Sequence, residues 1–254
     1  MSIKTAVLNG VFTIEIARPE KKNAITIDMY QAMADGLKAA QADGAVRAVL
    51  ITGQPGIFTS GNDLEDFMKR PPSGQDSPVF QFMQALNGCE KPVVAAVTGA
   101  AIGIGTTMLL HCDLVYVADE ARLAMPFVSL GLVPEFASSL VVPQLVGRVK
   151  AAEKILLGEP FSGVEAVEMG IANAVLPTSE VAPHARRIAE RFNALPPGAV
   201  RDTKKLLRRA GSEATLQAIQ AEAAIFAERL TSPEAREAFS AFFQKRKPDF
   251  SQFS

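Results

Sequence analysis

Three glycine-containing turns hold the polar residues that could carry chemistry in this chain. The turns are GIFTSGNDL (56–64), GAAIGIGTTM (99–108) and GLVPEFASSL (131–140). Each follows an apolar segment, and in α/β proteins ligands bind at turns that follow strands. In the first turn, Asn62 and Asp63 have the alternative role of capping a helix. The second turn opens a helix, so it offers a free backbone N–H at Ile104. Two such turns on adjacent strands would direct two N–H donors at one developing oxyanion.

Glu135 is the candidate acid or base. It follows Pro134, and Val133, Phe136 and Phe127 are its apolar neighbours in the sequence. Burial among such side chains disfavours the carboxylate and raises the pKa of the acid towards that of a useful proton shuttle. The alternative is that Glu135 is only an acid in the first turn of a helix.

Other chemistries fit the sequence less well. The second turn imitates a dinucleotide-binding fingerprint, but Met108 stands where the third glycine belongs and no acid ends a suitable second strand. Ser60 has no glycine two residues before it to build a nucleophile elbow. His111 and His184 are therefore interpreted as a core or surface histidine rather than as the base of a triad.

Strands and helices must alternate to position these turns. Phe12, Ile14 and Ile16 alternate with polar residues as in a half-buried strand, and Asn9-Gly10 before them is typical of a hairpin turn. Thr26 is the expected cap of a helix that ends near residues 43–44. The elements expected after it are strands at 45–53, 91–99 and 113–119, a short strand near Leu123, and helices at 106–111 and after Pro134. This alternation predicts parallel βαβ units and an α/β fold.

After Pro177 the sequence predicts helices only. They are expected at 181–194, 197–210, 213–230 and 233–246. Ser232 supplies a cap for the last of them, and Ser162 and Glu165 form a capping box for an earlier short helix closed by Gly170. The run at about 69–78 is expected to be a mobile loop. We therefore predict a core over 1–177 and a helical region over 178–254 that covers the core or packs on another subunit.

Composition excludes several classes of protein. The 254 residues are 48% hydrophobic and 21% charged, with a formal net charge of -1, so no overall field attracts nucleic acid or an anionic membrane. Cys89, Cys112 and two histidines support neither a disulfide framework nor a zinc cluster. No window approaches ~18 uninterrupted apolar residues, and the start lacks a secretory signal pattern. We expect a cytoplasmic protein without a metal, a membrane or a nucleic-acid partner.

Five motifs in order resemble the crotonase, or enoyl-CoA hydratase/isomerase, superfamily over nearly the whole chain. They are ARPEKKNAI (17–25), FTSGNDL (58–64), KPVVAAVTGAAIGIG (91–105), CDLVYVADEARLAMPFVSLGLVPE (112–135) and LLGEPFSGVEAVEMGIANAVLP (156–177). The resemblance implies a spiral ββα core with a C-terminal helical region that mediates trimerisation. It also implies acyl-CoA substrates, with no cofactor beyond the coenzyme A they carry. The thioester carbonyl would accept the backbone N–H groups of Asn62 and Ile104.

Departures from the family pattern favour one reaction. Hydratases of this family use two glutamates, and Thr107 and Phe127 occupy those positions here. Without that pair, hydration loses its general acid and base, each worth about 10²–10⁴-fold. The SGNDL and PEFASS segments instead resemble the monofunctional, peroxisomal-type enoyl-CoA delta isomerases, in which a single catalytic glutamate occupies the place of Glu135. The resemblance thus implies an enzyme that moves a β,γ double bond to the α,β position through a thioester enolate.

The resemblance also implies a set of substrate-binding residues. They are Arg18, Lys22, Asn23, Ala24, Ser60, Gly61, Asn62, Asp63, Leu64, Gly103 and Phe127. Arg18 and Lys22 are the candidate phosphate partners, with a solvated surface charge as the alternative for each. Two other functions stay open. One is a hydratase, another lyase or a thioester hydrolase that uses Glu135 on water, and the other is a non-catalytic acyl-CoA-binding paralogue.

A stripe of apolar residues in the C-terminal region suggests self-association. The stripe consists of Leu216, Ile219, Ala223, Phe226 and Leu230. It exceeds what a small cap on the core requires, so we expect contact with another subunit to bury it. The family resemblance implies a homotrimer or a dimer of trimers.

Overall fold

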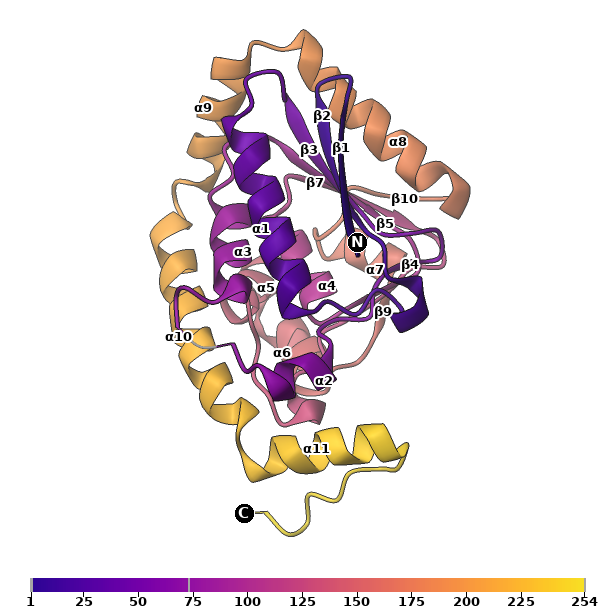
Figure 1. Cartoon of the computed structure of the whole chain (residues 1–254), viewed down its shortest axis with the longest axis vertical. Helices are drawn as coiled ribbons and strands as arrows, with labels where there is room; N and C mark the ends of the chain where they lie inside the picture. The colour runs from indigo at the N-terminus through magenta and orange to yellow at the C-terminus, as the bar shows by residue number, and fades with distance from the viewer. Residues whose placement is uncertain (1, 73, 254) are drawn as a thin grey trace.

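The chain begins with a β-hairpin in the computed structural model, which describes residues 2–72 and 74–253 (Figure 1). β1 (Ile3–Leu8) pairs antiparallel with β2 (Val11–Ile16) through the Asn9-Gly10 turn. Asn9 and Gly10 have φ values of 49° and 71°, as a two-residue type I′ turn requires. The predicted hairpin is confirmed.

The strands that follow are divided between two sheets. β3 (Ala48–Thr52), β5 (Val93–Val97), β7 (Leu114–Ala118) and β10 (Ala174–Leu176) extend the hairpin into a sheet of order β1-β2-β3-β5-β7-β10. The second sheet, of order β4-β6-β8-β9, contains β4 (Ile57–Thr59), β6 (Ala100–Ile102), β8 (Arg122–Ala124) and β9 (Phe161–Ser162). The chain passes from β3 to β4, from β5 to β6 and from β7 to β8, and so winds as a spiral between the sheets. The predicted α/β spiral is therefore confirmed.

Helices cover the sheets and fill the turns of the spiral. In the first part of the chain they are α1 (Ile27–Ala42), α2 (Leu64–Lys69), α3 (Pro78–Asn87), α4 (Ile104–Thr107), α5 (Ser138–Val146), α6 (Arg148–Leu156) and α7 (Gly163–Glu168). Thr26 caps α1 by accepting the Met29 N–H, and α7 has the predicted capping box of Ser162 and Glu165. α1 and α3 pack against each other, and β3 and β5 between the helical layers are almost wholly buried.

Two helices differ from their predicted bounds. The segment predicted as one helix over 106–111 forms α4 followed by a 3₁₀ turn, Met108–His111. The helix expected after Pro134 begins only at Ser138, because Phe136 and Ala137 have φ values of 56° and 57°, outside the helical region. Glu135 therefore lies outside the helix, and its interpretation as a first-turn acid is wrong.

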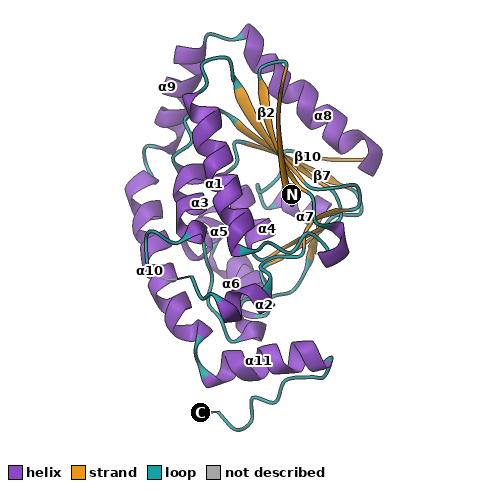
Figure 2. Cartoon of the chain, in the orientation of Figure 1, coloured by secondary structure: helices purple, strands orange, loops and turns teal. Residues whose placement is uncertain are grey.

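The C-terminal helices are close to their predicted positions. They are α8 (Thr178–Arg191), α9 (Pro197–Arg208), α10 (Ser212–Leu230) and α11 (Pro233–Gln244). α8 packs on the six-stranded sheet and α10 packs on α5. In the view of Figure 2, α9 and α10 follow one another along one side of the molecule and α11 crosses its end. Ile219, Phe226 and Leu230 are buried within the chain itself. The expectation that another subunit buries this stripe is wrong for those residues, whereas the division after residue 177 stays a prediction.

Candidate active site

The turns after β4 and β6 lie against each other. The two strands pair in parallel, with Ile57 opposite Ala100. A Cβ on Gly61 would lie 3.0 Å from the carbonyl oxygen of Ile102, and a Cβ on Gly105 would lie 2.6 Å from Cγ2 of Thr59. Glycine at 61 and 105 therefore permits the close approach of the two turns.

Both turns present backbone N–H groups that have no acceptor in the described part of the chain, and those of Asn62 and Ile104 are among them. The Asp63 N–H donates to the Ile25 carbonyl at 2.9 Å, and the Gly103 N–H donates to the Ala124 carbonyl at 2.8 Å. Ile104 is the first residue of α4, so its N–H has no intrahelical acceptor. The two predicted oxyanion donors thus belong to adjacent turns.

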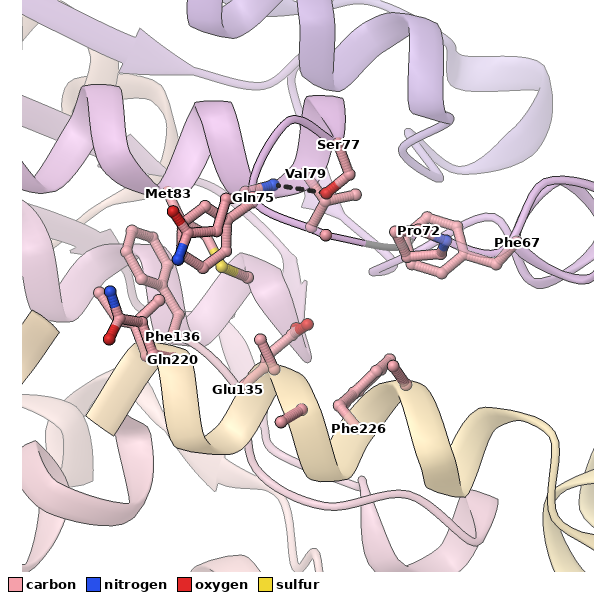
Figure 3. Close-up of a pocket in the computed structure, with 16 residues that line it drawn as sticks. Phe67, Pro72, Gln75, Ser77, Val79, Met83, Glu135, Phe136, Gln220 and Phe226 are labelled. Atoms are coloured by element: carbon pink, nitrogen blue, oxygen red, sulfur yellow. Dashed lines mark hydrogen bonds between the residues drawn. The ribbon is translucent and has the colours of Figure 1, made fainter. Parts of the chain in front are cut away.

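Glu135 lines an apolar cavity of about 240 Å³. Val79 and Met83 from α3, Phe136, and Phe226 from α10 contribute its walls, and the Glu135 carboxyl points in between them (Figure 3). The Glu135 side chain is buried, and its Oε1 has no hydrogen-bond partner among the described residues. A buried and unpaired carboxyl oxygen inside a cavity is typical of a reactive group, so Glu135 is the candidate acid or base of this site.

The pKa of Glu135 is raised from 4.5 to about 8, chiefly because its side chain is buried. The nearby Glu222 carboxyl on α10 contributes to this rise, and the Asn62 side chain acts against it. Tyr30 donates its hydroxyl to Oδ1 of Asn62, which leaves the Asn62 amide NH₂ free to face Glu135. A pKa near neutrality suits a group that must both remove and return a proton.

A strained turn carries Glu135 into the cavity. Phe136 and Ala137 are left-handed without being glycine, at a cost of about 1–2 kcal/mol each. The His111 ring stacks on the Phe136 ring at 3.7 Å, and its Nε2 donates to the Phe136 carbonyl at 2.8 Å. Burial lowers the pKa of His111 to about 4, so the ring is neutral at physiological pH. Glu222 accepts backbone N–H groups from the same turn. Sequence reasoning missed the part that His111 and Glu222 play here.

The segment that contains Lys22, Asn23 and Ala24 packs on the turn after β4. The Asn23 side chain is fully buried and donates to the carbonyl oxygens of Ile16 and Phe58 at 3.0 and 3.1 Å. The Ser60 N–H donates to the Lys22 carbonyl at 3.1 Å. Asn23 therefore supports the turn through its side chain, while Lys22 is exposed.

Arg18 and Asp63 form an ion pair within this assembly. A terminal nitrogen of Arg18 lies 2.6 Å from Oδ2 of Asp63 and donates to the Ala24 carbonyl at 2.9 Å. Oδ1 of Asp63 caps α2, which begins at Leu64, by accepting the Asp66 N–H. The Arg18 guanidinium is thus engaged inside the protein, which matches neither a free phosphate partner nor a solvated surface charge. Asp63 is the helix cap, and Asn62 is not.

The two positions at which hydratases of the resembled family keep glutamates carry no acid. Thr107 is fully buried, and its hydroxyl has no hydrogen-bond partner in the described ranges. Phe127 is also buried, and its ring lies 3.9 Å from where a Cβ on Gly103 would be. Among the residues described, no cluster of three or more His, Cys, Asp or Glu side chains forms a metal site, and no helix is both long and apolar enough to cross a bilayer.

Comparisons with known proteins agree on the family. Residues 7–253 match the model of the enoyl-CoA hydratase/isomerase family. Over 221 residues the chain is 35% identical to enoyl-CoA delta isomerase 2 of Homo sapiens, an alignment that covers 84% of this chain and 56% of the human protein. It is 31% identical over 255 residues to a probable enoyl-CoA hydratase of Bacillus subtilis (strain 168), covering 98% of both chains. The structure of Pseudomonas aeruginosa OdaA is similar with a TM-score of 0.93 and 53% identity, over 95% of this chain and 98% of that one.

Proposed function

The chain belongs to the enoyl-CoA hydratase/isomerase family, and from the site within this framework we propose that it isomerises β,γ-enoyl-CoA to α,β-enoyl-CoA. One observation carries the proposal. Among the described residues that line the apolar cavity, Glu135 is the single carboxylate. A double-bond shift needs one group that moves a proton between two carbons, and one buried glutamate supplies it.

The proposed reaction uses Glu135 twice. Its carboxylate removes a proton from the α-carbon, and the electrons of that C–H bond move to the thioester oxygen to form an enolate. The N–H groups of Asn62 and Ile104 donate to this oxygen and stabilise its charge. Protonated Glu135 then delivers the proton to the γ-carbon, the enolate collapses, and the double bond lies between the α- and β-carbons. No atom is gained or lost, so no second reactant is needed.

Hydration is the second candidate, because the chain also resembles a protein named as a probable hydratase. It requires a second carboxylate to activate and orient water, and Thr107 and Phe127 cannot provide one. Glu222 is the other carboxyl near Glu135, but it accepts two backbone N–H groups and does not line the cavity. The lack of a second carboxylate in the cavity favours isomerisation over hydration.

The surroundings of the site support an acyl-CoA substrate. The apolar cavity beside Glu135 suits an acyl chain. Exposed Lys22 is the better phosphate partner of the two predicted cations, since Arg18 is paired with Asp63. The adjoining turn over residues 60–64, together with Gly103 and Phe127, would complete the binding groove.

We also propose that the chain forms a homotrimer or a dimer of trimers. Large apolar side chains are exposed on its C-terminal helices, namely Leu206, Leu207, Leu216, Ile225, Phe242 and Phe243. Contact between subunits would remove them from water. Sedimentation should therefore give an oligomer, and a stable monomer at micromolar concentration would contradict this proposal.

Product analysis tests the proposed reaction. The purified protein is given 3-hexenoyl-CoA in one reaction and crotonyl-CoA in another, and the products are separated by chromatography. We expect rapid formation of 2-hexenoyl-CoA and slow or absent formation of 3-hydroxyacyl-CoA. Rapid hydration of crotonyl-CoA without isomerisation would overturn the proposal in favour of a hydratase, and release of free coenzyme A would favour a thioester hydrolase. Tight binding of coenzyme A with no product would favour a binding protein.

A further inference from the structure

Glu222 is a buried acid that the reaction proposed above does not use. It lies on α10, and its side chain is buried against the turn that carries Glu135. Its Oε2 lies 2.5 Å from the Ala137 nitrogen, and its Oε1 lies 2.9 Å from the Ser139 nitrogen. Both N–H groups donate, so the two oxygens of one carboxylate bridge the start of α5 from a helix 85 residues further along the chain.

The bridged backbone has no cap of its own. The first N–H groups of a helix need acceptors from outside it, and Ala137, at the N-cap position of α5, has no side-chain acceptor. Phe136 and Ala137 also hold left-handed conformations that non-glycine residues adopt only when their surroundings enforce them. The Glu222 bridge therefore both satisfies this helix start and fixes the strained turn immediately after Glu135.

We propose that Glu222 is a positioning residue for Glu135, whose bridge to the backbone of Ala137 and Ser139 fixes the direction of the catalytic carboxyl. This inference rests on the proposed function only where activity is measured. A helix cap that acts on stability alone would have no effect on Glu135. Glu222 has a second route to Glu135, because its negative charge lies close enough to favour the protonated form of that acid.

The other groups around Glu135 leave Glu222 as the source of this electrostatic effect. Asn62 from the turn after β4 and Tyr30 from α1 face Glu135 as hydrogen-bonding groups without a charge. His111 lies behind Phe136 and is neutral because burial lowers its pKa. Within the described chain, Glu222 is therefore the charged group whose removal should lower the pKa of Glu135.

The test compares Glu222→Gln with Glu228→Gln, which removes the same charge from an exposed position on the same helix. The titration of Glu135 is followed by infrared spectra of the carboxyl band. For the wild type and each variant, the spectrum of the same protein with Glu135→Gln is subtracted, so that the difference reports on Glu135. We expect the Glu135 midpoint to fall by about one pH unit or more in Glu222→Gln, as for loss of a nearby like charge. It should be unchanged in Glu228→Gln. This measurement needs no turnover, so it tests the effect of Glu222 on Glu135 even if the wild type is not an isomerase.

Isomerase kinetics give the second reading. In Glu222→Gln the acid limb of kcat/KM should move to lower pH with the infrared midpoint. The plateau kcat should fall by about 10- to 100-fold with little change in KM, because an amide can accept only one of the two N–H groups and the carboxyl is displaced. A fall in thermal stability with an unmoved midpoint and unchanged plateau kcat would reduce Glu222 to a structural cap and overturn the proposal.

A conservative variant keeps the proposal testable if Glu222→Gln fails to fold. Glu222→Asp retains the charge but withdraws the carboxylate by one methylene. We expect the Glu135 midpoint to stay raised while the plateau kcat falls, which separates the charge of Glu222 from its geometry. A wild-type kcat in Glu222→Asp would show that the bridge does not position Glu135.

Discussion

The C-terminal helices bury charges against the core at two places, and they do so in opposite ways. Where α9 meets the core, Lys204 lies 2.6 Å from one oxygen of Asp113 and Arg208 lies 3.1 Å from the other. Where α10 meets the core, Glu222 and Glu135 bring two acids together, and one oxygen of Glu135 has no partner in the described structure. The first place pairs opposite charges, whereas the second brings two acidic side chains close together.

The two places differ in how far the buried charges are compensated. Burial lowers the pKa of Lys204, and the charge of Asp113 acts against that shift. Asp113 also accepts the Val93 N–H at 2.7 Å, so its bonding capacity is well used. Glu135 has no opposite charge beside it, only the Asn62 amide acts against its burial, and its pKa is raised to about 8. An arrangement that costs stability without a compensating contact is typical of a functional site.

The largest expected effect is the loss of activity in Glu135→Gln. The amide has the same shape but cannot move the proton, so isomerisation should fall by at least ~10²–10⁴-fold while coenzyme A binding is retained. For the wild type, kcat/KM should rise with pH through an acid limb near the Glu135 pKa of about 8, because the base acts only when deprotonated.

Restoring a carboxylate elsewhere should not rescue that variant. Phe127→Glu in the Glu135→Gln background places an acid at one hydratase position, but Thr107 still lacks the partner acid and the aromatic wall is lost. Near-normal turnover in Glu135→Gln itself would remove Glu135 from the mechanism and direct the search for a base to Asp63.

Asp113→Asn tests the paired region. It leaves Lys204 and Arg208 as two uncompensated cations in a buried contact. The free energy of unfolding, measured in urea, should fall by about 3–5 kcal/mol, while kcat per folded molecule should be unchanged. Asp202→Asn on the exposed face of α9 is the control and should have little effect. Equal stability of the two variants would mean that the α9 contact does not depend on its charges.

Glu135→Gln should also change how stability depends on pH. The Glu135 pKa is 4.5 in the unfolded reference and about 8 in the folded protein, so the folded state binds more protons between those values. The contribution of Glu135 to the free energy of unfolding is therefore fully present below pH 4.5 and is lost as the pH rises towards 8. Glutamine does not titrate, so Glu135→Gln does not lose stability in this way. Its free energy of unfolding should exceed that of the wild type by a growing amount, which reaches a few kcal/mol at pH 9. Parallel melting-temperature curves for the two proteins across this range would contradict the raised pKa.

Features that depend on residues close in sequence were predictable from the sequence. The Asn9-Gly10 hairpin, the Thr26 cap and the two turns with free N–H groups each depend on residues close in sequence. Glu135 was recognisable from its apolar neighbours and its motif. These features needed no knowledge of distant contacts.

Contacts between distant segments account for what the sequence did not reveal. The approach of Glu222 to Glu135, the stack of His111 on Phe136, and the pairing of Arg18 with Asp63 join segments with no local pattern in common. The left-handed turn at Phe136 and Ala137 delays α5 for the same reason, because distant groups enforce it. Sequence periodicity likewise identified the apolar stripe of α10, but whether its own core or another subunit covers the stripe depends on tertiary packing.

The smallest expected effect concerns two adjacent threonines. Thr107 has a buried hydroxyl with no partner among the described residues, whereas Thr106 donates to the Ala101 carbonyl at 2.6 Å and accepts the Ala124 N–H at 3.2 Å. Thr107→Val removes an unsatisfied group and should raise the free energy of unfolding by about 1 kcal/mol. Thr106→Val breaks two bonds and should lower it by about 1–3 kcal/mol. Isomerase kcat should be unchanged in Thr107→Val, because this position, a glutamate in hydratases of the family, has no part in the proposed proton transfer. A loss of isomerase kcat in Thr107→Val would contradict this and would mean that the Thr107 hydroxyl takes part in the reaction.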